Sequence, residues 1–257
     1  GDTDDVKLKR AWLDGRVGGV KLSAGRVYAV QGDMIDAEAD GVFASYKFGK
    51  VNLTGWALKN VNAANTFKTD DDGDRLYMVK ADTKFGKLGA FVQYWKADAT
   101  TVTKDKAGTV TAVTPSSGEV FELGLSYPVA KGLTLFGQYY KGSADDKFDG
   151  GDKNGYEFGL KYLGAKAAKP GTWGAWVTYD DRPASTFVKP TCFNTYAFNS
   201  GDWFDVKKGD GFKGFEIGAN YTFAKNIVGE VRYFDYKGRE GDNSKVKTLW
   251  SHVVFTF

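Results

Sequence analysis

The sequence contains very few of the residues from which most enzyme sites are built. Its 257 residues include one cysteine, one histidine, two methionines and five prolines. A single cysteine, Cys192, excludes an internal disulfide framework and any CxxC metal or redox motif. His252 is the only histidine, which removes most hydrolase and metalloenzyme sites. We therefore expect a protein that is not an enzyme and that binds no cofactor and no metal.

Long apolar runs and a strong net charge are also missing. No segment reaches the roughly 18 apolar residues of a transmembrane helix. The net charge of +3 is nearly neutral for this length, which argues against a nucleic-acid partner. What the chain has in quantity is aromatic residues, at 16%, and 33 glycines. This composition argues against a helical bundle.

Apolar and polar residues alternate with a period of two along the whole chain, and no segment holds a helical stripe. The alternation predicts about thirteen strands, each with roughly the nine to eleven residues that cross a bilayer at a tilt. The expected spans are 4–13, 20–30, 41–48, 51–60, 75–85, 88–97, 119–127, 133–142, 154–163, 172–180, 213–223, 227–237 and 245–257.

The expected connections fall into two alternating classes. Short turns lie at 14–19, 49–50, 86–87, 128–132, 164–171 and 224–226. Long polar loops lie at 31–40, 61–74, 98–118, 143–153, 181–212 and 238–244. Short turns on one side and long loops on the other are typical of outer-membrane β-barrels. We expect an all-β fold, a closed antiparallel transmembrane β-barrel that forms a single domain over residues 1–257.

The two phases of the strands differ in chemistry. The phase expected to face lipid has the aromatic residues Tyr46, Phe48, Tyr77, Phe85, Tyr94, Tyr127, Tyr139, Tyr162, Trp173, Tyr179, Tyr221, Phe223 and Tyr233. The opposite phase supplies the expected lumen-lining residues Lys80, Asp82, Lys84, Glu122, Glu157, Lys161, Asp180, Glu216, Glu230 and Arg232. Each Lys or Arg pointed into lipid would cost about 2–4 kcal/mol near the midplane, so this phase requires a wet interior.

The final strand has Leu249, Ser251, Val253, Phe255 and Phe257 on one phase. This ending resembles the sorting signals of outer-membrane barrels. Bacterial barrels have an even number of strands with both termini in the periplasm. The odd count therefore predicts one or three N-terminal strands before residue 1, which gives 14 or 16 in all. A hidden strand within 181–213 is the alternative.

Residues 22–42 (LSAGRVYAVQGDMIDAEADGV) resemble general trimeric porins, in which a strand ending in Gly-Arg precedes an inward-folded loop. The resemblance favours sixteen strands and makes 31–40 the constricting loop. It implies a bacterial outer-membrane homotrimer for passive diffusion of ions and small hydrophilic solutes, in contact with membrane lipid. The aromatic loop 181–212 is expected to fold into the lumen or over a neighbouring subunit, as a gate or as packing.

The pore constriction expected from this resemblance sets acidic loop residues against basic wall residues, because rings of charge select ions. The acidic residues are Asp33, Asp36 and Glu38, and the basic residues are Arg26, Lys7, Lys9 and Lys47. Strict alternation turns Arg26 outward, so its inclusion assumes a bulge near Gly25. The alternative is that these are ordinary lumen charges that pair with each other.

The segment 5–15 (DVKLKRAWLDG) resembles porins that have an N-terminal S-layer-homology domain. That resemblance implies a tether to a cell-wall polymer, through a domain outside these residues. Two rival functions remain open. One is a structural membrane anchor with a plugged barrel, and the other is a secreted carbohydrate-binding β-sandwich.

Overall fold

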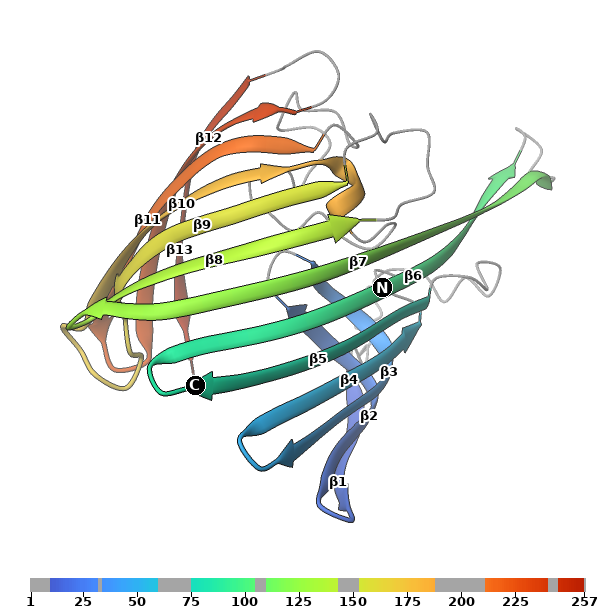
Figure 1. Ribbon diagram of the computed structural model, residues 1–257, viewed down its shortest axis with the longest axis horizontal. Coiled ribbons are helices and arrows are strands. Elements are labelled where there is room, and N and C mark those ends of the chain that lie inside the picture. Colours follow the sequence, from blue (N-terminus) through green and yellow to red (C-terminus); the bar gives the residue numbers. More distant parts are fainter. Residues whose placement is uncertain are drawn as a thin grey trace, which may run out of the picture.

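The computed structural model describes residues 10–31, 34–59, 75–104, 110–142, 153–187, 211–239 and 245–256 (Figure 1). They form one antiparallel sheet of thirteen strands in chain order. The strands are β1 (Ala11–Val17), β2 (Val20–Gln31), β3 (Ile35–Phe48), β4 (Val51–Lys59), β5 (Arg75–Phe85), β6 (Leu88–Lys104), β7 (Val110–Ala130), β8 (Leu133–Gly142), β9 (Asn154–Leu163), β10 (Trp173–Arg182), β11 (Phe212–Ala224), β12 (Ile227–Gly238) and β13 (Lys245–Phe255). A short 3-10 helix, η1 (Ala184–Thr186), follows β10.

The sheet curls strongly, so that β13 and the β2–β3 hairpin lie behind the middle strands in Figure 1. Each strand pairs with its neighbours in sequence, and within the described residues β1 and β13 are its two edges. The all-β antiparallel prediction is confirmed, while barrel closure stays a prediction. Across the described part of the chain, no helix is long and apolar enough to cross a membrane.

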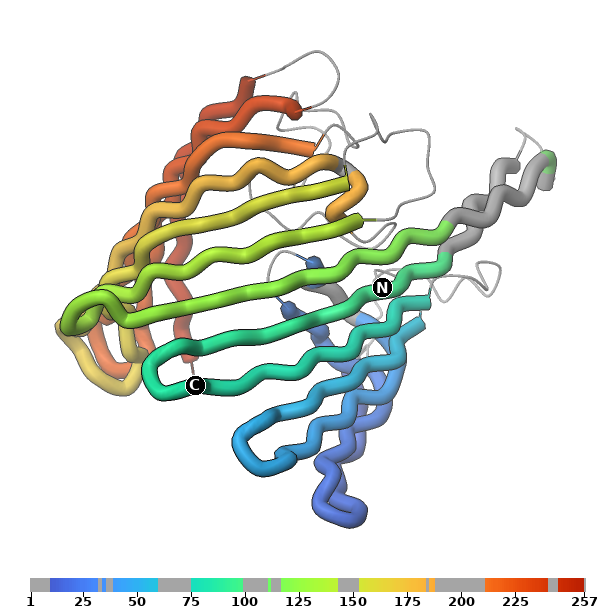
Figure 2. The backbone as a smooth tube through the Cα atoms, viewed as in Figure 1, coloured from blue at the N-terminus to red at the C-terminus, as the bar shows by residue number. Residues whose placement is uncertain are grey.

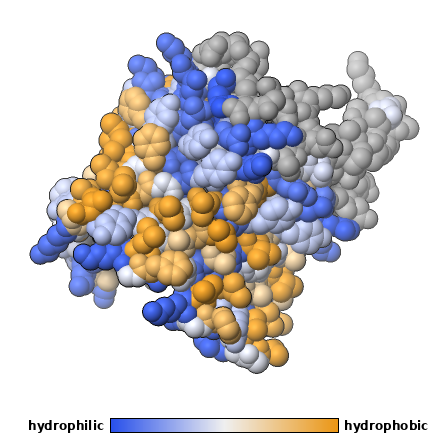
Figure 3. Space-filling view, viewed as in Figure 1, coloured by the Kyte–Doolittle hydropathy of each residue, from blue (hydrophilic) through white to orange (hydrophobic). Residues whose placement is uncertain are grey.

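Burial alternates along the strands as the sequence pattern predicts. In β5, Leu76 and Met78 are buried, whereas Tyr77 and Val79 are 40% and 61% exposed. The exposed phase is apolar and aromatic, and Figure 3 shows these residues gathered over the outer face of the sheet. Apolar side chains on this face and charged side chains on the other are the arrangement that a bilayer requires.

The two ends of the sheet differ in their connections. Tight turns join β3 to β4 at 49–50 and β5 to β6 at 86–87, where Gly49 and Gly86 adopt φ of 58° and 60°. The other short turns lie at the same end of the sheet, as the tube in Figure 2 shows. The three longest connections, 60–74, 143–153 and 183–211, start and end at the opposite end of the sheet, as predicted, but the connections 32–34 and 105–109 at that end are short.

Two expected loops are wrong in extent. The expected loop 98–118 is largely strand, because β6 and β7 stay paired as far as Lys104 and Val110. This segment is rich in Thr and Val, which favour strands, and a hairpin above the bilayer needs no contrast between its faces. Residues 35–40 of the expected loop 31–40 lie in β3 and pair with β2.

The ends of two other strands also differ from the prediction. The first described strand, Ala11–Val17, continues four residues past the expected end at 13, because only Gly18 and Gly19 are needed to turn the chain. Residues 1–9 lie outside the described part. At the other strand, β10 continues through Asp181 to Arg182, two residues beyond the expected 180.

Candidate functional site: the inner face of the sheet

The β2–β3 hairpin bends where two glycines face each other, Gly25 and Gly41. A Cβ on Gly41 would lie 2.2 Å from the carbonyl oxygen of Ala57 in β4, and one on Gly25 would lie 2.3 Å from that of Ala11 in β1. Gly25 also has φ of 136°, a region that disfavours other residues. The glycines thus allow β2 and β3 to press closely against both neighbouring strands.

Beyond these glycines the end of the hairpin folds over the inner face. We define the β2–β3 tip as residues 29–31 and 34–35. Its Ala29, Met34 and Ile35 are buried in one apolar cluster with side chains of β4–β8. From those strands the cluster includes Leu58, Leu76, Met78, Trp95, Ala97, Val120 and Tyr140. Apart from Leu58 of β4, which pairs with β3, the wall that the tip covers is formed by strands that are not its neighbours in the sheet.

Hydrogen bonds also join the tip to this wall. Gln31 Nε2 donates to Gln93 Oε1 at 3.3 Å, and Gln93 Nε2 donates to Glu122 Oε2 at 3.2 Å. On the next strands, Gln138 Nε2 and Tyr140 Oη donate to the two carboxylate oxygens of Glu157 at 3.1 and 2.7 Å. These groups surround a cavity of about 210 Å³, which Met34 and Lys80 also line.

Arg182 meets the tip from the far side of the interior. This residue ends β10 and is fully buried. Its guanidinium lies 3.9 Å from the ring centre of Tyr140 and 4.0 Å from that of Phe187. Nη2 donates to the carbonyl of Thr186 at 3.2 Å and lies 3.6 Å from Met34 Sδ. Contact between Arg182 and Met34 spans the interior between β10 and the β2–β3 tip.

A second polar group lies on β10–β12. Trp176 Nε1 donates to Glu216 Oε1 at 2.6 Å, and Arg232 lies 3.5 Å from the same oxygen. Arg232 also donates through Nε to Glu230 Oε1 at 2.6 Å. Trp176, Glu230 and Arg232 border a cavity of about 250 Å³ together with Lys161. The interior thus offers water-sized space lined by both signs of charge.

The expected lumen-lining residues all occupy the inner phase of their strands. Besides the two groups above, Lys80 Nζ lies 4.6 Å from the ring centre of Phe91, and Asp82 accepts a bond of 2.8 Å from Asn52. Asp180 accepts a bond of 2.9 Å from Tyr236 Oη. Lys84 and Lys161 are exposed. The role of all these lumen-lining residues in conduction stays a prediction.

Arg26 and Lys47, the two expected constriction residues that the structure describes in full, lie apart from each other. Arg26 forms a two-bond ion pair with Asp40, at 2.7 and 2.8 Å. The β2–β3 register passes through Gly25 without a shift, so the assumed bulge is wrong and Arg26 keeps the outer phase. Lys47 stands seven residues beyond Asp40 along β3, about 24 Å away, toward the short turns.

The other members of that set are only partly described. In the register of the hairpin, Asp36 stands opposite Val30 and Glu38 opposite Tyr28. The side chains of these two acidic residues lie outside the described part of the chain, as do Lys7, Lys9 and Asp33 in full. The same holds for residues 188–210 of the aromatic loop, including Cys192.

Sequence reasoning missed Arg182, Gln31 and Met34. The alternation of β10 gave a signal for Arg182, because the inner phase of Thr178 and Asp180 continues to residue 182. Nothing local pairs Arg182 with Met34, since 148 residues separate them. Within the described residues, no group of three or more His, Cys, Asp or Glu is placed to hold a metal ion.

The sequence matches the family of Gram-negative porins over residues 13–181. A loop-deletion variant of OmpT, an outer membrane protein of Vibrio cholerae, is similar in structure, with a TM-score of 0.59 at 14% identity; the match covers 98% of this chain and 81% of that one. OccK11 (OpdR) of Pseudomonas aeruginosa has a TM-score of 0.54 at 12% identity, with 96% and 76% covered. No curated protein matches the sequence. The chain belongs to the Gram-negative porin family and lies in the bacterial outer membrane.

Proposed function

We propose that this porin is a passive diffusion channel for ions and small hydrophilic solutes, and that it is not an enzyme. The observation that supports this most is the contrast between the two faces of the sheet. Glu122, Glu157 and Arg232 line cavities on the inner face, whereas the outer face exposes aromatic and aliphatic side chains. Charged walls around a water-filled lumen filter solutes by size and by charge.

A diffusion channel requires a closed wall, and we propose that further strands complete the barrel between β1 and β13. Every described residue of β1 is exposed, including Leu13 at 81%. An edge strand of this kind presents unpaired backbone groups, which a bilayer does not tolerate. Three more strands would give sixteen in total and one more would give fourteen, both with the even parity of bacterial barrels.

We place the narrowest part of the channel where the β2–β3 tip meets Arg182. This contact joins two elements across the interior, and the cavity next to it is lined by Lys80, Glu122 and Glu157. Charge on both sides of such a passage would set the preference for cations or anions. The constriction therefore involves a residue of β10 in addition to the loop that follows β2.

A second function follows from the buried apolar cluster under the tip. Met34 and Ile35 cover Trp95 and Leu76 on the inner face, which is the packing expected of a plugged barrel. A plugged barrel would act as a membrane anchor, and the resemblance to porins with a cell-wall-binding domain gives such an anchor a role as a tether. Assembly as a homotrimer rests on the same kind of resemblance.

Single-channel conductance of the full-length protein in a planar lipid bilayer separates these functions. A diffusion channel gives ohmic steps and a reversal potential that shifts in a salt gradient, and a trimer gives steps in groups of three. Protein that inserts and never conducts would overturn the channel and favour the anchor. The secreted carbohydrate-binding β-sandwich is wrong, because the described strands form one sheet and the chain belongs to an outer-membrane family.

A further inference from the structure

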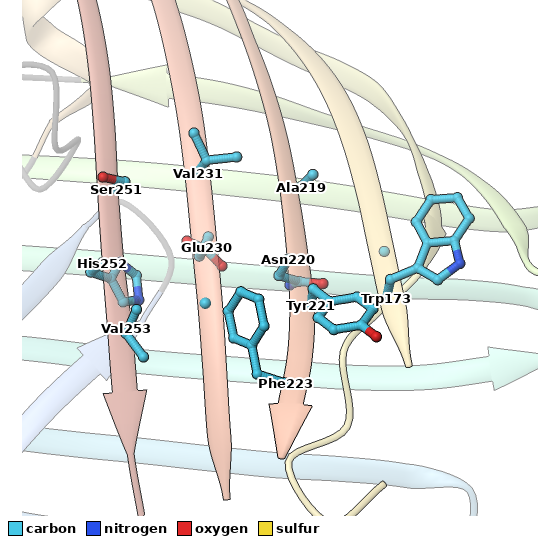
Figure 4. Close-up of a pocket in the computed structure, with 12 residues that line it drawn as sticks. Trp173, Ala219, Asn220, Tyr221, Phe223, Glu230, Val231, Ser251, His252 and Val253 are labelled. Carbon is cyan, nitrogen blue, oxygen red and sulfur yellow. The ribbon is translucent and has the colours of Figure 1, made fainter. Parts of the chain in front are cut away.

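A groove of about 640 Å³ crosses β10–β13 close to the short turns. Its walls include the outward side chains of Trp173, Tyr221 and Phe223, and small residues such as Ala219 and Ser251 leave it open. Figure 4 shows Tyr221 beside Trp173 between β11 and β10, and Phe223 between β12 and β11. The groove thus faces the side of the sheet that the membrane covers.

Glycine fixes the position of one wall. The ring of Phe223 lies across Gly229 of β12, where a Cβ would come within 2.4 Å of Cε2. Tyr221 packs against Phe223 at 5.2 Å between ring centres. These aromatic walls stand next to the turns, at the depth where aromatic side chains of a barrel meet the lipid headgroups.

Three exposed lysines lie at the turn end of this groove. Lys166 and Lys169 belong to the connection 164–172, which leads directly into Trp173, and Lys225 follows Phe223 by two residues. The two connections are joined, because Asn226 N donates to the carbonyl of Ala167 at 2.7 Å. Neither connection contains an acidic residue. A positive site therefore adjoins an apolar groove at headgroup depth.

We propose that this groove binds one anionic phospholipid, with an acyl chain against the aromatic walls and its phosphate beside Lys166, Lys169 and Lys225. The apolar groove suits a hydrocarbon chain, and the lysines suit a negative headgroup, each contributing about 1 kcal/mol at a membrane surface. A hydrophilic anionic polymer would use only the lysines. The proposal needs the outer-membrane location but not the conduction of solutes.

Native mass spectrometry of the full-length protein in detergent tests the headgroup. The protein is titrated with phosphatidylglycerol or with phosphatidylcholine of the same chains. The wild type should bind phosphatidylglycerol at least about tenfold more tightly. The variant with Lys166→Gln, Lys169→Gln and Lys225→Gln should lose that preference. The matched control neutralises the lysines of three other short turns, with Lys50→Gln, Lys87→Gln and Lys131→Gln, and should keep it.

A second variant tests the groove. Ser251→Phe fills the space between the walls and should reduce the binding of both lipids, while single-channel conductance stays unchanged because Ser251 lies on the outer face. An equal loss of the preference for phosphatidylglycerol in the two lysine variants would overturn the specific site, because any basic turn would then bind the headgroup. A Ser251→Phe protein that binds lipid normally, or that changes its oligomeric mass instead, would also overturn it and would assign the groove to a second copy of the chain.

Discussion

At the scale of single residues, Arg182 has the most unusual surroundings on the inner face. A fully buried guanidinium is costly unless the protein satisfies it. Here the faces of Tyr140 and Phe187 cover it, and the carbonyl of Thr186 accepts one of its hydrogen bonds. Because Arg182 also reaches Met34, one side chain joins β10 to the β2–β3 tip.

Arg182→Met keeps the length of the side chain and removes its charge. We expect the free energy of unfolding to fall by about 2 kcal/mol, the size of a desolvated cation–π contact, and the conductance to rise as the tip loosens. Urea unfolding followed by gel mobility, with single-channel recording, measures both. Lys141→Gln, which removes an exposed charge from the outer phase of β8, is the control. Unchanged stability and conductance in Arg182→Met would show that this contact neither holds the tip nor narrows the pore.

Glu216 offers a test of charge selection. Glu216→Gln keeps an acceptor for Trp176 Nε1 and removes one of the two negative partners of Arg232, which keeps Glu230. The loss of stability should be about 1 kcal/mol, because the pair is partly buried but Arg232 keeps its bond to Glu230, while the reversal potential shifts toward anions. Glu119→Gln removes a similar charge from the outer phase, where it pairs with Lys96 at 3.7 Å, and should leave selectivity as it was. Equal shifts in both variants would contradict an inner-face origin of selectivity.

At the scale of elements, the β2–β3 hairpin depends on its glycines. Gly41→Val would place side-chain atoms against the Ala57 carbonyl and Leu58, so the hairpin must move away from β4. We expect a cost of about 1–3 kcal/mol and a change in conductance. Gly55→Val is the matched control in β4, because the nearest atom to its Cβ would be 3.8 Å away. Heat-dependent mobility on a gel and single-channel conductance should change in Gly41→Val and not in Gly55→Val. Identical behaviour of the two variants would refute the close approach at Gly41.

The strands that cross the membrane could be predicted from the sequence, because lipid on one face and water on the other impose alternation. The β6–β7 extension could not, because residues 99–116 do not keep the regular alternation of apolar and polar residues seen in the other strands. The sequence analysis assigned the first residues of β3 to a loop, because they include several acidic residues. Ile35, Ala37 and Ala39 nevertheless alternate with these acidic residues, as in a strand. Contacts such as Met34 with Arg182 depend on how the sheet curls, which no local pattern encodes.

At the scale of the whole molecule, the sheet separates two environments. Val79 lies in the middle of β5 and is 61% exposed on the outer face. Val79→Lys should destabilise the protein by about 2–4 kcal/mol in a bilayer. Gln138→Lys adds the same charge to the inner face, beside Glu157, and should cost little. Unfolding in vesicles measures the difference, and a similar cost at both positions would contradict the assignment of the two faces.

The register of the sheet has a consequence for how such a protein can change over evolution. The described pairings slip only between Thr103 and Lys104, Pro128 and Ala130, and Thr222 and Ala224, all near strand ends. A point substitution inside a strand alters one face only. An insertion of one residue there would exchange the faces for the rest of the strand and expose buried charge to lipid. Gains and losses of sequence length are therefore confined to the connections, while the wall diversifies by replacement alone.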